Sequence, residues 1–166
     1  MQVLPETDVA RLLDRFVEEE VPGRRGFEAW RSLLRAHATL MRRLDTDLQR
    51  ETGLALADFD VLAQLAAAHG ALRMTELADR ALISRSGMSR RVARLVGEGL
   101  VRRDKAGTDA RGIVVALTEA GIARLAETAP LHARGISELF VAQLDDQELA
   151  LLEGALNKLI VDCSFG

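Results

Sequence analysis

Arginine and serine residues are concentrated in one short stretch of the sequence. Between residues 85 and 111 there are eight basic and three acidic side chains, whereas the whole chain of 166 residues has a formal net charge of −3. Guanidinium groups can form paired hydrogen bonds with phosphates or with the edge of guanine, and serine hydroxyls bond to either group. A basic stretch within an acidic chain therefore indicates that a polyanion binds at one place on the surface.

The arginine-rich stretch has the periodicity of a helix that begins at Ser84 or Ser86 and ends near Gly97 or Gly99. One face of this helix is apolar and contains Met88, Val92, Leu95 and Val96. The opposite face offers hydroxyl and guanidinium groups, which in a helix-turn-helix contact base edges in the major groove of DNA. The candidate DNA-binding residues of this helix are Ser84, Ser86, Ser89, Arg90, Arg91 and Arg94.

An arginine-rich helix face can also be ordinary solvated surface, but the flanking segments favour DNA binding. A short helix, capped by Thr75, is predicted over residues 75–81, and two strands over residues 100–105 and 112–117 follow as a hairpin. An arginine at a hairpin tip suits the narrow minor groove of DNA. The aspartate two residues before this arginine, Asp109, either orients a neighbouring arginine by a hydrogen bond or simply forms the turn. The hairpin thus adds Lys105, Asp109 and Arg111 to the candidate DNA-binding residues.

Further helices are predicted on both sides of this central region. The periodicity of apolar residues gives helices over about 7–20, 27–52 and 57–69, a long helix from Thr118, and a last helix from Asp145. Gly53 is expected to end the second helix, Asp58 to lie at the start of the third, and Pro130 to bend or divide the long one. Asp145 and Glu148 have the spacing of a capping box.

The predicted fold is mainly α with a small antiparallel β-hairpin, in the order of a winged helix-turn-helix. Residues 57–117 form the DNA-binding module, and residues 1–56 and 118–166 supply N- and C-terminal dimerisation helices. The apolar stripes over 7–20 and 120–160 have no partner in a small winged module, so we expect a second copy of the chain to cover them.

Other classes of function find little support in the sequence. There is no glycine-rich phosphate loop or nucleophile elbow, and His37, His69 and His132 lack the spacing of zinc ligands. We therefore expect no catalytic site, no metal site and no cofactor. No apolar run is long enough to span a membrane, and the lone Cys163 fits a reducing cytoplasm.

Three segments resemble the MarR family of bacterial transcriptional regulators: "FDVLAQLA" (59–66), "MTELADRALISRSGMSRRVARLVGEGLVRR" (74–103) and "DARGIVVALTEAG" (109–121). The resemblance implies a homodimer whose terminal helices interlock and whose two winged modules bind a palindrome in double-stranded DNA. It assigns Ser86, Ser89, Arg90 and Arg94 to the recognition helix and Asp109 and Arg111 to the wing. The wing "AGTDARG" departs from the family's commoner pattern of two acidic–arginine pairs.

Members of this family often release DNA when a small aromatic or phenolic compound enters a cleft beside the winged module. The residues proposed to line such a cleft are Trp30, His37, Met41 and Asp58. Trp30 and Met41 also fit the packed stripe of their helix, and Asp58 also fits a helix cap. The expected function is a sequence-specific repressor that binds a palindromic operator as a homodimer. The alternative is a winged-helix module that binds an acidic protein partner.

Overall fold

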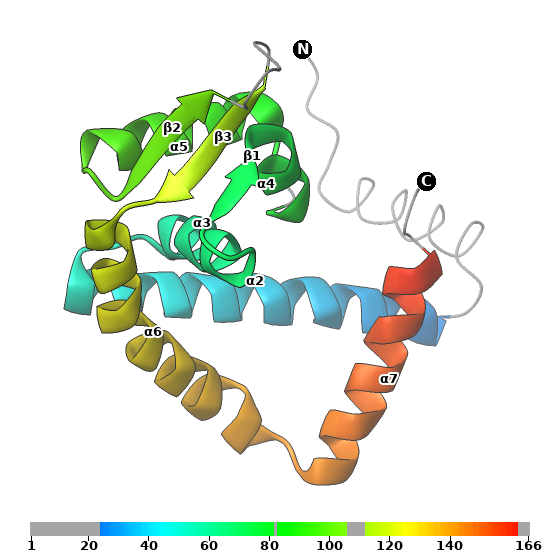
Figure 1. The fold of residues 1–166 in the computed structure, drawn as a ribbon. Helices are drawn as coiled ribbons and strands as arrows, with labels where there is room; N and C mark the ends of the chain where they lie inside the picture. Colours follow the sequence, from blue (N-terminus) through cyan, green and yellow to red (C-terminus); the bar gives the residue numbers. More distant parts are fainter. Residues whose placement is uncertain (1–23, 82, 106–111, 163–166) are drawn as a thin grey trace, which may run out of the picture. The chain divides into compact units, whose positions relative to one another are not determined.

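The computed structural model describes residues 24–81, 83–105 and 112–162, so the predicted helix over 7–20 and the residues Asp109, Arg111 and Cys163 lie outside the described residues. The chain divides into two compact units, residues 1–42 and 43–166. Helix α2 (Arg24–Thr52), drawn in blue to cyan in Figure 1, contributes residues to both units. None of the described helices is long and apolar enough to cross a membrane.

Helix α2 ends where the sequence predicts, because Gly53 follows Thr52 with a φ of 71° that glycine adopts without strain. Helix α3 (Leu56–Ala67) begins directly afterwards, and the carboxylate of Asp45 accepts a hydrogen bond of 2.8 Å from the backbone N–H of Leu56. The prediction that Asp58 caps this helix is wrong. The N-cap position is Ala55, and Asp58 is buried in the first turn with its carboxylate bonded elsewhere.

Three strands form one antiparallel sheet in the order β1-β3-β2: β1 (Ala71–Arg73), β2 (Val101–Lys105) and β3 (Ile113–Leu117). The predicted hairpin corresponds to β2 and β3, whose register places Val101 opposite Leu117 and Lys105 opposite Ile113. The sequence did not predict β1, which pairs with β3 through Leu72 and Val115. The sheet therefore ties the hairpin back to the segment that follows α3.

The helix-turn-helix consists of α4 (Met74–Arg80) and α5 (Arg85–Gly97). Thr75 was predicted to cap the first of these helices, and this is wrong, because the N-cap is Arg73, whose backbone N–H donates to Glu76 at 3.0 Å. Ser84 caps α5 by accepting a hydrogen bond of 3.2 Å from the N–H of Gly87. This bond decides between the two serines that could have opened the helix.

The core lies where α3, α4 and α5 pack against the sheet. Its fully buried side chains come from all of these elements: Val61, Leu62, Leu65, Leu77, Met88, Val92, Leu95, Val101 and Val115. Burial of such side chains contributes about 1.5–3 kcal/mol each. The core therefore fixes which face of α5 points outward, as a winged helix-turn-helix requires, and the predicted fold class is confirmed.

The C-terminal part contains α6 (Glu119–Leu139), a short 3₁₀ turn η1 (Val141–Gln143) and α7 (Asp146–Asp162). Pro130 lies inside α6 and does not divide it. The predicted capping box is confirmed, since the N–H of Asp145 donates to Glu148 at 2.9 Å and the N–H of Glu148 donates to Asp145 at 2.8 Å.

Candidate nucleic-acid interface

Helix α5 presents a polar face to solvent and an apolar face to the core. Ser86, Ser89 and Arg90 are exposed, whereas Met88, Val92 and Leu95 are completely buried. The predicted outward projection of the first three residues is thus confirmed, and their contact with DNA stays a prediction. Val96 differs from the prediction, because 38% of its surface is exposed even though it belongs to the apolar stripe.

Arg90 is an arginine of α5 that is available to a ligand. It lies in the middle of the helix on the exposed face. No hydrogen bond or ion pair joins its side chain to another residue within the described part of the chain. Its guanidinium group is therefore ready to form the two parallel hydrogen bonds that guanine or a phosphate accepts.

The other two arginines of this face are bound to Asp58 on α3. Arg91 donates to one carboxylate oxygen at 2.9 Å, and Arg94 donates to the other. The Asp58 side chain is only 5% exposed, whereas those of Arg91 and Arg94 are 25% and 51% exposed. Asp58 was predicted as a ligand contact or a cap, so the sequence did not predict its contact with the recognition helix.

Electrostatics favours this arrangement of three charges. The hydrogen bond with Asp58 raises the pKa of Arg94 above its ordinary value, although partial burial opposes the shift. The Nε of Arg91 is buried and has no hydrogen-bond partner within the described residues. Arg91 is thus less exposed than predicted and leaves one polar atom unsatisfied while it binds Asp58.

Strand β2 is attached to the same helix by a third arginine. Arg103 donates a hydrogen bond of 3.0 Å from Nη2 to the backbone carbonyl of Ser89 on α5. Arg102 is bonded within the sheet, to Asp104 at 2.9 Å and to the carbonyl of Leu117 at 3.3 Å. Lys105 is the last residue of β2. The base of the hairpin and the recognition helix therefore form one body.

Comparison with known proteins identifies this module. A sequence profile of the MarR family matches residues 52–112, which run from the end of α2 to the start of β3. The crystal structure of Sco3205, a MarR family transcriptional regulator from Streptomyces coelicolor in complex with DNA, is similar with a TM-score of 0.81 and 32% sequence identity. The match covers 87% of this chain and 91% of Sco3205. The chain belongs to the MarR family.

Two further proteins are similar to this MarR-family chain. AbsC, a MarR family transcriptional regulator from Streptomyces coelicolor, matches with a TM-score of 0.76 and 28% identity over 98% of this chain and 97% of AbsC. An HTH-type transcriptional regulator of Bacillus cereus is 28% identical over 78% of this chain and 85% of its own. Regulators of the MarR family are DNA-binding transcription factors and not enzymes.

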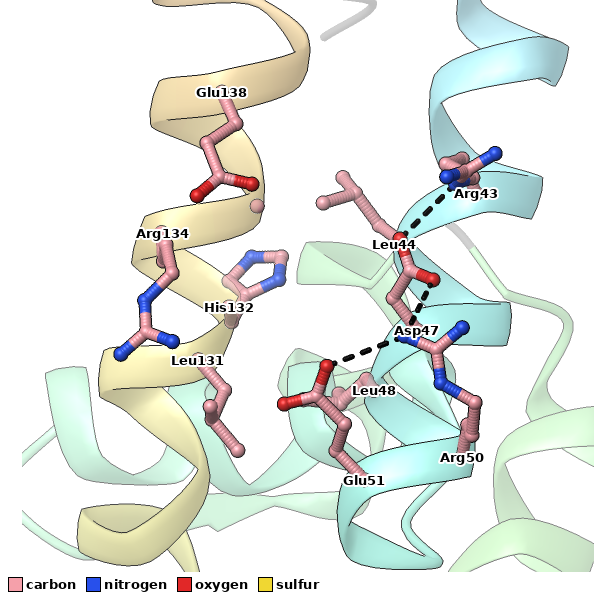
Figure 2. Close-up of a pocket in the computed structure, with 11 residues that line it drawn as sticks. Arg43, Leu44, Asp47, Leu48, Arg50, Glu51, Leu131, His132, Arg134 and Glu138 are labelled. Atoms are coloured by element: carbon pink, nitrogen blue, oxygen red, sulfur yellow. Dashed lines mark hydrogen bonds and ion pairs between the residues drawn. The ribbon is translucent and has the colours of Figure 1, made fainter.

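A cavity of about 210 Å³ separates the second half of α2 from α6 in this MarR-family protein. Figure 2 shows His132 pointing from α6 toward α2, with arginines and carboxylates around the rim. On the α2 side Asp47 pairs with Arg43 at 3.1 Å and with Arg50 at 3.2 Å. The cavity is also lined by the apolar side chains of Leu44, Leu48 and Leu131.

His132 is the polar group inside this cavity. Its ring packs against that of Phe59 with 4.6 Å between centroids, and its buried Nδ1 has no hydrogen-bond partner within the described residues. The sequence predicted no role for His132, because His37, His69 and His132 lack the spacing of zinc ligands. No group of three or more potential ligand side chains is placed to hold a metal ion in the part of the chain that the structure describes.

The residues predicted to bind a small ligand do not line this cavity. Trp30, His37 and Met41 belong to the unit formed by residues 1–42, and all three are exposed. Asp58 belongs to the other unit and is bonded to α5. A ligand role for these four residues stays a prediction, and the structure offers His132 as an additional candidate.

Burial lowers the pKa of His132 below its ordinary value of 6.5, and the charge of Asp60 opposes this shift only in part. As the pH falls below 6.5, His132 binds a proton in the unfolded chain but not yet in the folded protein. The free energy of unfolding therefore decreases as the pH falls, until the pH reaches the lowered pKa of the folded state.

We expect the substitution His132→Gln to remove this part of the loss of stability at low pH. Urea unfolding of the wild type and of His132→Gln at pH 7.5 and 5.5 measures the loss of stability between these pH values. His37→Gln, at an exposed histidine, is the control. An equal loss in wild type and His132→Gln would show that His132 does not contribute.

Proposed function

We propose that this protein is a transcriptional repressor that binds a palindromic operator as a homodimer in the cytoplasm, where its DNA lies. The observation that carries the proposal is the exposed face of α5, with Ser86, Ser89 and Arg90 held outward by completely buried residues on the reverse side. The adjoining β2 is bonded to the same helix. If the arginine-rich face of α5 were only solvated surface, there would be no reason to expect the supporting short helix α4 before it or the hairpin bonded to it.

The proposed contacts follow from the chemistry of each side chain. Arg90 would bind O6 and N7 of a guanine, and Ser86 and Ser89 would bond to bases or phosphates. Ser84 uses its hydroxyl to cap α5. The helix start also favours a phosphate, because its exposed backbone N–H groups and its dipole attract negative charge. Lys105, Asp109 and Arg111 remain the proposed contacts of the hairpin.

A homodimer is supported by the apolar surface of α7. Leu151 is 75% exposed, Ile160 is 66% exposed, and Leu159 is also exposed. Large apolar side chains gathered on one helix mark an interaction surface, and a second copy of the chain is the commonest partner. The exposed side chains of α7 are therefore the ones that we propose for the predicted dimerisation role of residues 118–166. A two-fold dimer would present two recognition helices to half-sites about one turn of DNA apart.

Release of DNA by a small molecule is supported by the cavity between α2 and α6. A cavity of about 150 Å³ can hold benzene, so the volume of about 210 Å³ is sufficient for a molecule with one aromatic ring. The unpartnered Nδ1 of His132 would bond to a hydroxyl or carboxyl group on that ring. Small phenols and aromatic acids are therefore the first compounds to test as effectors.

Selection of bound duplexes from a random pool tests the proposed function. We expect an enriched sequence with two inverted half-sites, a dimer mass by light scattering, and binding that weakens steeply with salt as counterions are released. Phenols and aromatic acids are then added to the enriched duplex to look for release. A protein that binds an acidic protein partner instead would enrich no sequence, and this outcome would contradict the proposal.

A further inference from the structure

One carboxylate holds two arginines of the recognition helix. Arg91 and Arg94 lie one turn apart on α5, and both donate to Asp58, which lies on α3 outside the helix-turn-helix. Figure 1 shows α3 and α5 as separate elements of the DNA-binding module. The bonds therefore connect the DNA-facing helix with the body that supports it.

The carboxylate itself is firmly placed. Asp58 is in the first turn of α3, where Asp45 binds the backbone N–H of Leu56, and its neighbour Phe59 is buried in the core. A carboxylate that is almost fully buried needs cationic partners, because an unpaired buried charge is strongly unfavourable. Moving both guanidinium groups away from Asp58 would leave its buried carboxylate unpaired, which costs free energy. A phosphate that binds these arginines instead would have to offset that cost.

We propose that Asp58 determines the specificity of the regulator without touching DNA. It occupies the guanidinium groups of Arg91 and Arg94, so that these charges do not bind the phosphates of every duplex. Arg90 is left as an arginine of the exposed face that is available to a base, and a sequence with the matching base is needed to obtain strong binding. This inference rests on the proposed DNA-binding function and adds a residue that limits non-specific affinity.

The degrees of exposure explain how the two arginines differ. Arg91 is 25% exposed and its Nε is buried, so it is the more firmly held of the two. Arg94 is 51% exposed, and part of its guanidinium group can still face a ligand while the bond to Asp58 persists. Loss of the carboxylate charge would release both groups, and each additional neutralised phosphate steepens the salt dependence by about 0.9.

Asp58→Asn tests this inference, with Asp60→Asn as matched control. The control removes the same charge from the same helix, and Asp60 makes no hydrogen bond or ion pair with α5 within the described residues. Affinities for the selected operator and for a random duplex are measured at several salt concentrations. We expect Asp58→Asn to raise random-duplex affinity about three- to tenfold, to steepen its salt dependence by about 1–2 and to lower the ratio of specific to non-specific affinity.

A second pair of variants keeps the test informative if Asp58→Asn does not fold. Arg91→Gln and Arg90→Gln each remove one positive charge from α5, but only Arg91 is bonded to Asp58. We expect Arg90→Gln to lower random-duplex affinity and Arg91→Gln to leave it within about twofold, because Arg91 is already occupied. Circular dichroism of each variant confirms that it is folded before binding is measured.

The possible failures are distinguishable. If wild type prefers the operator but Asp58→Asn leaves the ratio of affinities unchanged, the inference about Asp58 is overturned and the proposed function stands. A parallel fall in both affinities would assign Asp58 a purely structural role and overturn it too. Equal losses of random-duplex affinity in Arg91→Gln and Arg90→Gln would also overturn the inference about Asp58. If wild type prefers no sequence, the proposed function fails and the inference fails with it.

Discussion

Arg90→Ala is expected to lower the affinity for the selected operator by about 1–3 kcal/mol, or roughly 5- to 150-fold. The side chain is exposed on α5 and makes no bond within the described residues, so its removal leaves the folded protein unchanged. Fluorescence anisotropy with the operator, and with duplexes that differ from it by one base pair, measures the effect. One position of each half-site should lose its base preference.

Arg90→Lys is the control that separates charge from geometry. Lysine keeps the positive charge but lacks the planar fork that engages two acceptors of guanine. We therefore expect Arg90→Lys to bind a random duplex like wild type and to lose most of the preference for the operator. Operator affinity that stays at the wild-type value in both variants would exclude Arg90 as a base contact. Arg94→Ala is less clean, because it also removes a partner from the buried Asp58.

Gly121→Ala is expected to destabilise the protein by about 1–3 kcal/mol, the usual cost of inserting an atom into a packed site. Gly121 is buried in the first turn of α6, and a methyl group there would overlap the backbone carbonyl of Leu100. The turn cannot easily move away. The Thr118 hydroxyl donates to the carbonyl of Gly99 at 2.7 Å and accepts from the N–H of Gly121 at 3.0 Å. Urea unfolding followed by circular dichroism measures the change.

Gly97→Ala on α5 is the matched control for this substitution. Both glycines are helical, but Gly97 is exposed, and a methyl group there would meet no neighbouring atom of the described residues within 4 Å. Alanine normally stabilises an exposed helix by about 0.5–1 kcal/mol relative to glycine, so the two changes should have opposite signs. Stabilisation by Gly121→Ala would mean that α6 does not approach the start of β2 as closely as the structure places it.

Features encoded by neighbouring residues could be predicted from the sequence. The end of α2 at Gly53, the capping box at Asp145 and the two faces of α5 each depend on residue types within one or two turns. The hairpin of β2 and β3 is local in the same sense. The family resemblance rested on these segments, and the match to Sco3205 confirms it.

Features that depend on distant residues were missed. Strand β1 has only three residues, too few for an alternating pattern, and it exists because Leu72 pairs with Val115 more than forty residues later. Asp58 resembles a helix cap in sequence, and only the packing of α3 shows that its carboxylate meets α5. The same holds for His132, whose cavity arises between two helices that are far apart along the chain.

The bond between Arg103 and the carbonyl of Ser89, together with the five paired positions of β2 and β3, has a consequence for the shape of bound DNA. In the proposed complex with DNA, α5 and β2 could not adjust the distance between them, because they are bonded together. The duplex would then have to bend or narrow to fit, at a cost that depends on how deformable its intervening base steps are. Base pairs that no side chain reaches would then still influence how well a site is bound.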